Sequence, residues 1–179
     1  MKASALSTPL SAVLALFLIY ALPCSSDEDI PPSRCSYNGY TMTCTRLPRG
    51  SSFPSPDLVK SGISTYIFTD CHFNTLPTVP YNETAVRLII RNSDVTTIPD
   101  GAFSGLGKLR YLEVSSNFVR DINKETFRGL SKLNFLILSH NQLQELGNDL
   151  LEHLPKLDKL DVTGNPYISF HVDLLTPAT

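Results

Sequence analysis

Residues with catalytic or metal-binding chemistry are few in this sequence, and they stand apart from one another. The four histidines, His72, His140, His153 and His171, lack the spacing of metal ligands. The sequence contains no G-x-S-x-G, H-E-x-x-H, C-x-x-C or glycine-rich phosphate-loop motif. The carboxylates fall mainly on segments that we expect at the surface. We therefore expect no enzyme activity, no cofactor and no metal site.

The amino terminus has the pattern of a secretion signal. Lys2 is followed by an apolar stretch from Leu10 to Leu22 and then by small residues around Cys24. The stretch is shorter than the about 20 apolar residues of a membrane-spanning helix, and no longer apolar run follows it. We interpret residues 1–24 as a signal peptide that is cleaved between positions 24 and 27. The expected mature chain is secreted and is not inserted in a membrane.

Two further expectations depend on export. The only glycosylation sequon starts at Asn82, and a glycan on an exported chain would mark that edge as solvent-facing. Cys24 is expected to leave with the signal peptide, so that Cys71 remains as a buried free thiol. Cleavage before Cys24 would instead allow a bridge between Cys24 and Cys71. The pairing of Cys71 therefore depends on the cleavage site.

Composition and charge exclude several classes of partner. The 179 residues are 42% hydrophobic and 18% charged, which suits one folded domain with a single core. With 15 basic and 17 acidic residues, the formal net charge is −2. This balance provides no broad basic field for a nucleic-acid backbone or an anionic membrane. We expect neither as a partner.

An internal repeat is the strongest pattern in the chain. Segments 109–117, 133–141 and 157–165 share the pattern L-x-x-L-x-L/V-x-x-N at a constant spacing of 24 residues, and weaker copies start at Ala85 and Ile63. The pattern resembles the leucine-rich repeat over residues 63–167. The resemblance implies an α/β solenoid of five repeats. It would be a right-handed curved coil with a parallel β-sheet on its concave face and little helix.

Each repeat also has a physical interpretation of its own. The fourth and sixth positions are apolar and alternate with other residues, which predicts a short strand with one face turned inward. A side-chain amide at the ninth position can satisfy buried backbone groups where the chain leaves the strand. This ladder position is occupied in turn by Cys71, Ser93, Asn117, Asn141 and Asn165. Since serine is its weakest member, we expect the ladder to be thinnest at Ser93.

A solenoid exposes its core at both ends unless caps cover it. Residues 27–62 would form an amino-terminal extension and cap. The segment from Cys35 to Cys44, followed by Leu47-Pro48, resembles the cysteine-containing amino-terminal cap of extracellular leucine-rich-repeat proteins, which implies a disulfide between Cys35 and Cys44. A hairpin around Asn38-Gly39 would bring the two sulfurs together, and export makes the oxidation reasonable. The tail, residues 168–179, has no cysteine. We expect the last repeat to be poorly covered unless apolar residues of the tail fold over it.

The strand period also predicts which side chains face a partner. Positions four and six point inward, so positions three, five and seven point outward on the concave side. Ile89, Tyr111 and Phe135 would then form part of an apolar patch beside arginines, a combination that suits a protein interface. The predicted partner-binding residues are Arg87, Ile89, Arg91, Tyr111, Glu113, Phe135, Ile137 and Lys159. The alternative is that some of these side chains cover one another or lie under a glycan.

These patterns predict a binding module for an extracellular protein ligand or receptor. Two forms of it are open: a self-standing secreted protein, or the amino-terminal fragment of a membrane receptor or adhesion protein. A different class is a structural protein that organises the extracellular matrix. The even charge balance and the apolar outward positions favour a protein partner over that class.

Overall fold

The computed structural model describes residues 35–54, 62–80, 84–146 and 148–170, all within the unit Ser33–Thr179. The expected signal peptide, Asn82 of the sequon and residues 171–179 of the tail lie outside the described residues. Within the described ranges, no helix combines the length and apolar character needed to reach across a lipid bilayer.

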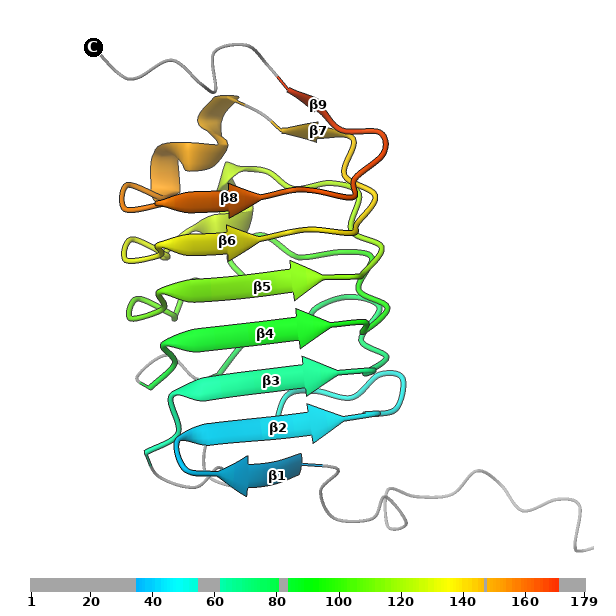
Figure 1. Cartoon of the computed structure of the whole chain (residues 1–179), viewed down its shortest axis with the longest axis vertical. Coiled ribbons are helices and arrows are strands. Elements are labelled where there is room, and N and C mark those ends of the chain that lie inside the picture. Colours follow the sequence, from blue (N-terminus) through cyan, green and yellow to red (C-terminus); the bar gives the residue numbers. More distant parts are fainter. Residues whose placement is uncertain (1–34, 55–61, 81–83, 147, 171–179) are drawn as a thin grey trace, which may run out of the picture. The chain divides into compact units, whose positions relative to one another are not determined.

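A seven-stranded sheet forms one side of this unit (Figure 1). Its strands are β1 (Cys35–Asn38), β2 (Thr41–Thr45), β3 (Thr65–Thr69), β4 (Arg87–Arg91), β5 (Tyr111–Ser115), β6 (Phe135–Ile137) and β8 (Lys159–Asp161). β1 runs antiparallel to β2, and each later pair is parallel. Each turn of the chain adds one strand beside the previous one. This architecture confirms the solenoid with a parallel sheet that the repeat predicts.

The return segments contain little regular structure. The described residues include two short 3-10 helices, η2 (Lys124–Phe127) and η3 (Asn148–His153), and no α-helix. A second sheet consists of β7 (Glu145–Leu146) and β9 (Ser169–Phe170). η2 starts where the Asn123 side chain accepts hydrogen bonds from the backbone N–H groups of Glu125 and Thr126, at 2.8 and 3.1 Å. The expectation of little helix is confirmed.

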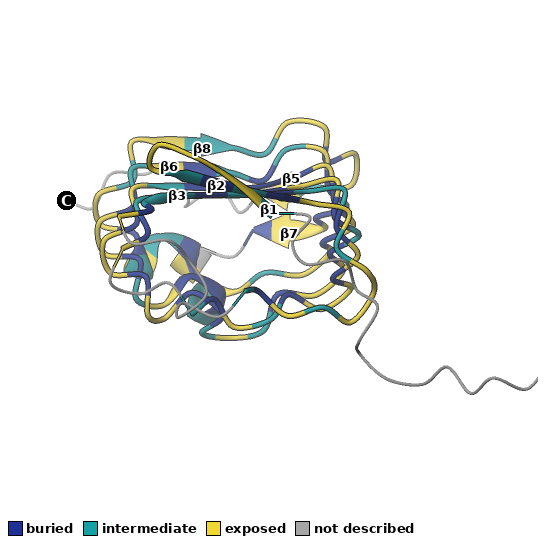
Figure 2. Ribbon diagram, turned by 90° about the horizontal axis from the view of Figure 1, so that it is seen from below, coloured by how far each residue is buried: buried dark blue, intermediate teal, exposed yellow. Residues whose placement is uncertain are grey.

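The core lies between the sheet and the return segments (Figure 2). Leu88, Leu112 and Leu136, at the fourth position of successive repeats, point inward and are completely buried. On the opposite side, the rings of Phe103 and Phe127 stack with their centroids 6.3 Å apart. Full burial of each such side chain stabilises the fold by about 1.5 to 3 kcal/mol. The 24-residue repeat therefore builds one continuous core from equivalent positions.

A ladder of buried asparagines joins consecutive turns. The side-chain oxygen of Asn117 accepts hydrogen bonds from the backbone N–H groups of Ser93 and Val95, at 2.9 and 3.1 Å. Its amide nitrogen donates to two backbone carbonyl oxygens. Asn141 and Asn165 make equivalent bonds one and two turns later. These amides satisfy backbone groups of their own turn and of the preceding turn that are shielded from water.

The ladder has fewer bonds at its beginning. The Ser93 hydroxyl accepts one hydrogen bond from the backbone of Cys71 and donates one to the carbonyl of Arg91. Cys71 is buried and is joined to no other cysteine of the described residues, and burial is the main cause that raises the pKa of its thiol. Its sulfur lies 3.4 Å from the carbonyl oxygen of Thr69. Serine and cysteine thus hold the turn with fewer contacts than asparagine does.

The amino-terminal end is closed by a hairpin with a disulfide. β1 pairs with β2, and the Cys35–Cys44 disulfide joins the two strands. The turn consists of Gly39 and Tyr40, one position later than the expected turn at Asn38-Gly39. Gly39 has a φ of 58°, a left-handed conformation that glycine adopts without strain. The hairpin adds an antiparallel edge strand before the first parallel one.

The other end of the sheet is less well covered. Leu160 and Val162 in the last repeat are only partly buried. Their counterparts one repeat earlier, Leu136 and Leu138, are completely buried. Each inward side chain is normally covered by both neighbouring turns, and β8 has a neighbour in the sheet on one side only. Within the described residues, the last repeat therefore has a thinner core than the interior ones.

Candidate protein-binding face

The outward face of the sheet aligns side chains from four consecutive strands. In the register of β4, β5, β6 and β8, Arg87, Tyr111, Phe135 and Lys159 are direct neighbours. Adjacent strands lie about 4.8 Å apart, so large side chains in such a row contact one another. Arg87, Phe135 and Lys159 are exposed, and Tyr111 is half-buried. These four residues are called the outer row below.

Three side chains of the outer row form a stack. The guanidinium carbon of Arg87 lies 4.1 Å from the centroid of the Tyr111 ring. The rings of Tyr111 and Phe135 have centroids 6.1 Å apart and planes inclined by 37°. A cation is attracted to the face of an aromatic ring, and aromatic pairs contribute about 0.5 to 1.5 kcal/mol beyond their burial. The stack therefore fixes exposed side chains in place before any partner binds.

Glu113 lies next to this stack and is occupied by contacts within the chain. Its residue is only 4% exposed. Arg91 holds both carboxylate oxygens, with Nε donating to Oε1 and Nη2 donating to Oε2 at 2.8 Å. The hydroxyls of Tyr111 and Ser115 also donate to the carboxylate, at 2.8 and 2.6 Å. Glu113 therefore organises the face and offers little surface to a partner.

This network determines the charges of its members. Burial by itself would raise the pKa of Glu113, but the hydrogen bonds to its carboxylate and the charge of Arg91 lower the pKa to about 2. The hydrogen bond to Glu113 is the main cause that raises the pKa of Arg91. Burial, followed by the bond to Glu113, raises the pKa of Tyr111. At neutral pH the network thus consists of a carboxylate, a guanidinium and a neutral phenol.

Exposure narrows the predicted set of partner-binding residues. The sequence places Ile89 in an exposed apolar patch, but this residue is only 5% exposed. In the register it lies between Ile67 and Glu113, and long arginine side chains flank it on β4, so little room is left for water. Ile137 is half-buried. The expected apolar patch is therefore interrupted at Ile89 and Glu113, and the outer row carries most of the accessible surface.

Ser115 belongs to this face, although it was not among the predicted residues. It is buried, and its hydroxyl donates to the Glu113 carboxylate at 2.6 Å. Residues two apart on a strand share a face, so the alternation that places Glu113 outward also places Ser115 beside it. That signal was present in the sequence, but a serine after a carboxylate does not by itself indicate a contact.

Comparison with known protein families agrees with this geometry. The sequence model of the leucine rich repeat family matches residues 84–143 and 108–166. Residues 84–166 are leucine-rich repeats. The matched segments contain β4, β5, β6 and β8, so the entire outer row lies within recognised repeats. No curated protein matches the sequence.

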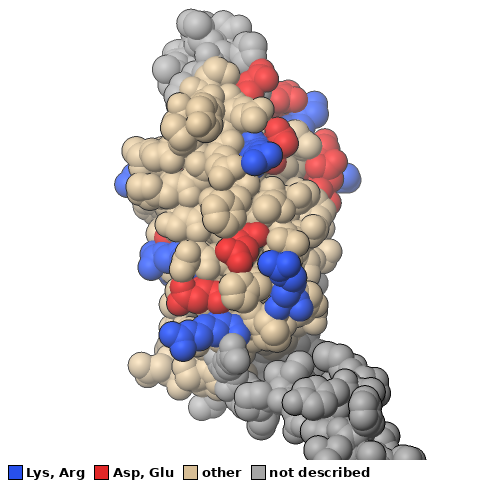
Figure 3. Space-filling model, turned by 90° about the vertical axis from the view of Figure 1, so that its right-hand side faces the viewer, with Lys and Arg blue, Asp and Glu red and all other residues tan. Residues whose placement is uncertain are grey.

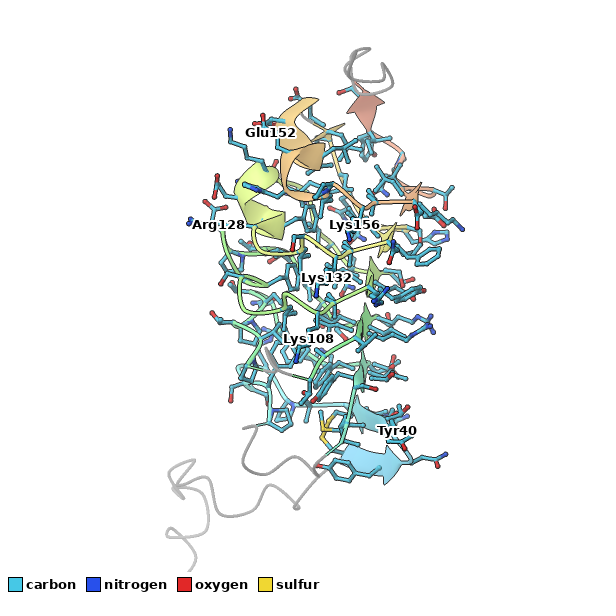
Figure 4. The ribbon with its side chains drawn as sticks, turned by 90° about the vertical axis from the view of Figure 1, so that its left-hand side faces the viewer. Tyr40, Lys108, Arg128, Lys132, Glu152 and Lys156 are labelled. Carbon is cyan, nitrogen blue, oxygen red and sulfur yellow. A yellow bond between two sulfur atoms is a disulfide. The ribbon has the colours of Figure 1, made fainter. Side chains whose placement is uncertain are left out.

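The leucine-rich repeats also align basic side chains at one edge of the sheet. Lys108, Lys132 and Lys156 precede the first leucine of successive repeats, and Figure 4 shows them one above the other. All three are exposed. On the flank reached by the carboxyl ends of the parallel strands, positive and negative side chains are interspersed (Figure 3). The stack of Arg87, Tyr111 and Phe135 belongs to the sheet face and not to these charged edges.

Two of the histidines lie against residues of a neighbouring turn. His72 Nδ1 lies 2.5 Å from a carboxylate oxygen of Asp94. The ring of His140 lies so close to Gly164 that an added Cβ would approach it to 2.5 Å. His171 lies outside the described residues. Among the residues that are described, no group of three or more side chains is arranged to hold a metal ion.

Proposed function

We propose that this chain is an exported module that binds another extracellular protein through the outer row of its sheet. The observation that carries the proposal is the stack of Arg87, Tyr111 and Phe135. Phe135 is 42% exposed at the end of this stack. Aromatic and arginine side chains dominate the binding energy of protein interfaces because they bury large areas. Their fixed position reduces the conformational entropy that is lost on binding.

The fold suits a binding role better than a catalytic one. A solenoid presents a wide, continuous surface built from equivalent positions of its repeats, and such surfaces are used to bind partners. On the sheet face, Arg91 and Glu113 are paired with each other. A carboxylate whose pKa is lowered to about 2 is a poor proton donor or acceptor near neutral pH. The face is therefore suited to recognition.

Three features support export. The first 24 residues have the composition of a signal peptide. The Cys35–Cys44 disulfide belongs to a class of bond that persists mainly in oxidising compartments. A sequon at Asn82 agrees with passage through the secretory pathway.

Export is tested by intact mass spectrometry of the full chain expressed in eukaryotic cells, with and without deglycosylation. The expected product is secreted, starts after Cys24, and contains one disulfide, one free thiol and a glycan on Asn82. Retention in the cells with an intact amino terminus would overturn the extracellular part of the proposal.

Binding is tested with the full chain on an array of purified extracellular domains. The wild-type protein is compared with Phe135→Asp, which places a charge on the outer row, and with Lys132→Ala, which changes an exposed cation at the edge. We expect domains that bind the wild-type and Lys132→Ala proteins and fail to bind Phe135→Asp. Domains that bind all three proteins equally would show that the partner contacts another surface.

A further inference from the structure

The two arginines of β4 point outward but differ in their pairing. Arg91 forms a two-point ion pair with Glu113. Arg87, two outward positions earlier on the same strand, lies over the ring of Tyr111 and forms no ion pair with any described residue. Arg87 is also exposed. The positive charge of Arg87 is therefore uncompensated within the described part of the chain.

The cation at the opposite end of the outer row has an acidic neighbour. Lys159 shares the outward face of β8 with Asp161. Hydrogen bonds from Thr163 are the main cause that lowers the pKa of Asp161, and the charge of Lys159 lowers it further. The positive charge of Lys159 is thus partly balanced by Asp161. Of the two cations in the outer row, Arg87 is therefore the one without an acidic neighbour on its own strand and the better site for an external anion.

The position of Arg87 also fits a particular kind of anion. A guanidinium that lies over an aromatic ring has one flat face covered, and its N–H donors point sideways from its edge. A carboxylate matches this edge with two parallel hydrogen bonds. The exposed ring of Phe135 lies one strand beyond Tyr111 in the same row. A ligand carboxylate at Arg87 would therefore have an apolar surface beside it.

We propose that the sheet face recognises a protein segment in which an aspartate or glutamate lies beside an aromatic or aliphatic side chain. The carboxylate pairs with Arg87, and the apolar side chain packs on Tyr111 and Phe135. A basic segment is repelled by Arg87, and a neutral segment leaves the covered guanidinium without a charged partner. The inference rests on the proposed function and adds the chemistry of the partner.

The test uses random 12-residue peptides displayed on phage and the full chain as bait. Peptides that bind the wild-type protein are collected after removal of those that also bind Phe135→Asp. A parallel selection uses Arg87→Glu as the bait. We expect the wild-type pool to be enriched in Asp or Glu beside apolar residues. In the Arg87→Glu pool we expect Lys or Arg at the same place, because the charge of the site is reversed.

One selected peptide is then measured by fluorescence anisotropy. Arg87→Ala should weaken its binding by about 10-fold or more, because a desolvated charge pair is lost. The matched control is Arg110→Ala, which removes an exposed arginine that lies outside the four outward positions of the row and should change binding less than about 2-fold. Replacing the acidic residue of the peptide by its amide should weaken binding to the wild-type protein and have no further effect on Arg87→Ala.

The outcomes separate the two proposals. Peptides that depend on Phe135 but show no acidic enrichment, or that bind Arg87→Ala normally, would overturn the carboxylate inference and leave the sheet face as the binding site. A selection in which every peptide binds Phe135→Asp as well as the wild-type protein would overturn both proposals. Circular dichroism of Arg87→Ala and Phe135→Asp verifies that the exposed substitutions leave the fold intact.

Discussion

Arg91 and Glu113 form an ion pair that runs diagonally across β4 and β5. In the register, Arg91 is opposite Ser115, and Glu113 is opposite Ile89. Two guanidinium nitrogens nevertheless reach both carboxylate oxygens. The hydroxyl of Tyr111 donates to the same carboxylate, so the pair is connected to the aromatic stack of the outer row. The geometry of the candidate binding face thus depends on one buried acid.

Glu113→Gln should lower the stability of the protein. The amide of glutamine accepts fewer hydrogen bonds than a carboxylate and carries no negative charge. Arg91 would therefore lose its ion-pair partner at a buried site, and the hydroxyls around that site would lose hydrogen bonds. We expect the free energy of unfolding at pH 7 to fall by about 1 to 3 kcal/mol in urea denaturation. The control is Glu152→Gln, an exposed partner of Lys124, which should change stability by less than about 0.5 kcal/mol. Equal effects would contradict the role of Glu113.

Acid should weaken the fold through the same residue. The pKa of Glu113 is lowered from 4.5 to about 2 in the folded protein. Its stabilising contribution is therefore complete above about pH 4.5 and is lost as the pH falls towards 2. At about 1.4 kcal/mol per pKa unit, the contribution is roughly 3 kcal/mol at most. In unfolding experiments at several pH values, the difference between the wild-type protein and Glu113→Gln should shrink as the pH falls. A constant difference from pH 6 to 2.5 would contradict this linkage.

Substitutions at neighbouring residues of β6 should affect different properties, namely folding stability for the inward residue and partner binding for the outward ones. Leu136 is completely buried, and Leu136→Ala should lower the free energy of unfolding by about 2 to 5 kcal/mol because it opens a cavity. Phe135→Ala combined with Ile137→Ala changes outward side chains and should have a much smaller effect on thermal unfolding. The double variant should instead weaken partner binding by about 2 kcal/mol or more. The same loss of thermal stability in both proteins would show that the assignment of the two faces is wrong.

Ladder positions should differ in importance. Asn141 accepts one backbone hydrogen bond and donates to three carbonyl oxygens, with all its contacts in or near buried turns. Asn141→Ala leaves several of these groups unsatisfied and should cost about 3 kcal/mol or more in urea denaturation. Ser93→Ala removes two hydrogen bonds and should cost less. A larger effect at Ser93 would contradict the order of the ladder.

Reduction of the Cys35–Cys44 disulfide should destabilise the amino-terminal end. The bond closes a short loop with a sequence separation of 9. Closing such a loop lowers the conformational entropy of the unfolded chain, which stabilises the folded state by about 2 to 3 kcal/mol. Cys35→Ser combined with Cys44→Ser should lower the melting temperature, and reductant should then have no additional effect. If reductant lowered the melting temperature of the variant as much as that of the wild-type protein, the stabilisation would have another source.

Much of the fold could be predicted because its determinants are local and repeated. Apolar residues two positions apart predict an inward face for each strand. Leu112 and Leu136, at equivalent positions of successive repeats, do point inward. The ladder asparagines follow from the same period, and Asn117 and Asn141 are buried as a turn-stabilising amide must be. The predicted turn of the first hairpin, Asn38-Gly39, was wrong by one residue. The observed turn, Gly39-Tyr40, also contains the glycine, so the position of the glycine alone does not distinguish the two turns.

The candidate binding face shows what the sequence by itself determined and what only the tertiary structure decided. Alternation along a strand assigns Arg87, Ile89 and Arg91 to the same outward face, and this assignment depends only on local geometry. The same rule cannot tell which of the three side chains is exposed, covered or paired with a charge. Arg91 is paired and Ile89 is covered because β5 places Glu113 beside them from 22 or more residues away, whereas Arg87 meets the ring of Tyr111. Exposure and pairing depend on the register and length of side chains on neighbouring strands, and these are properties of the folded sheet.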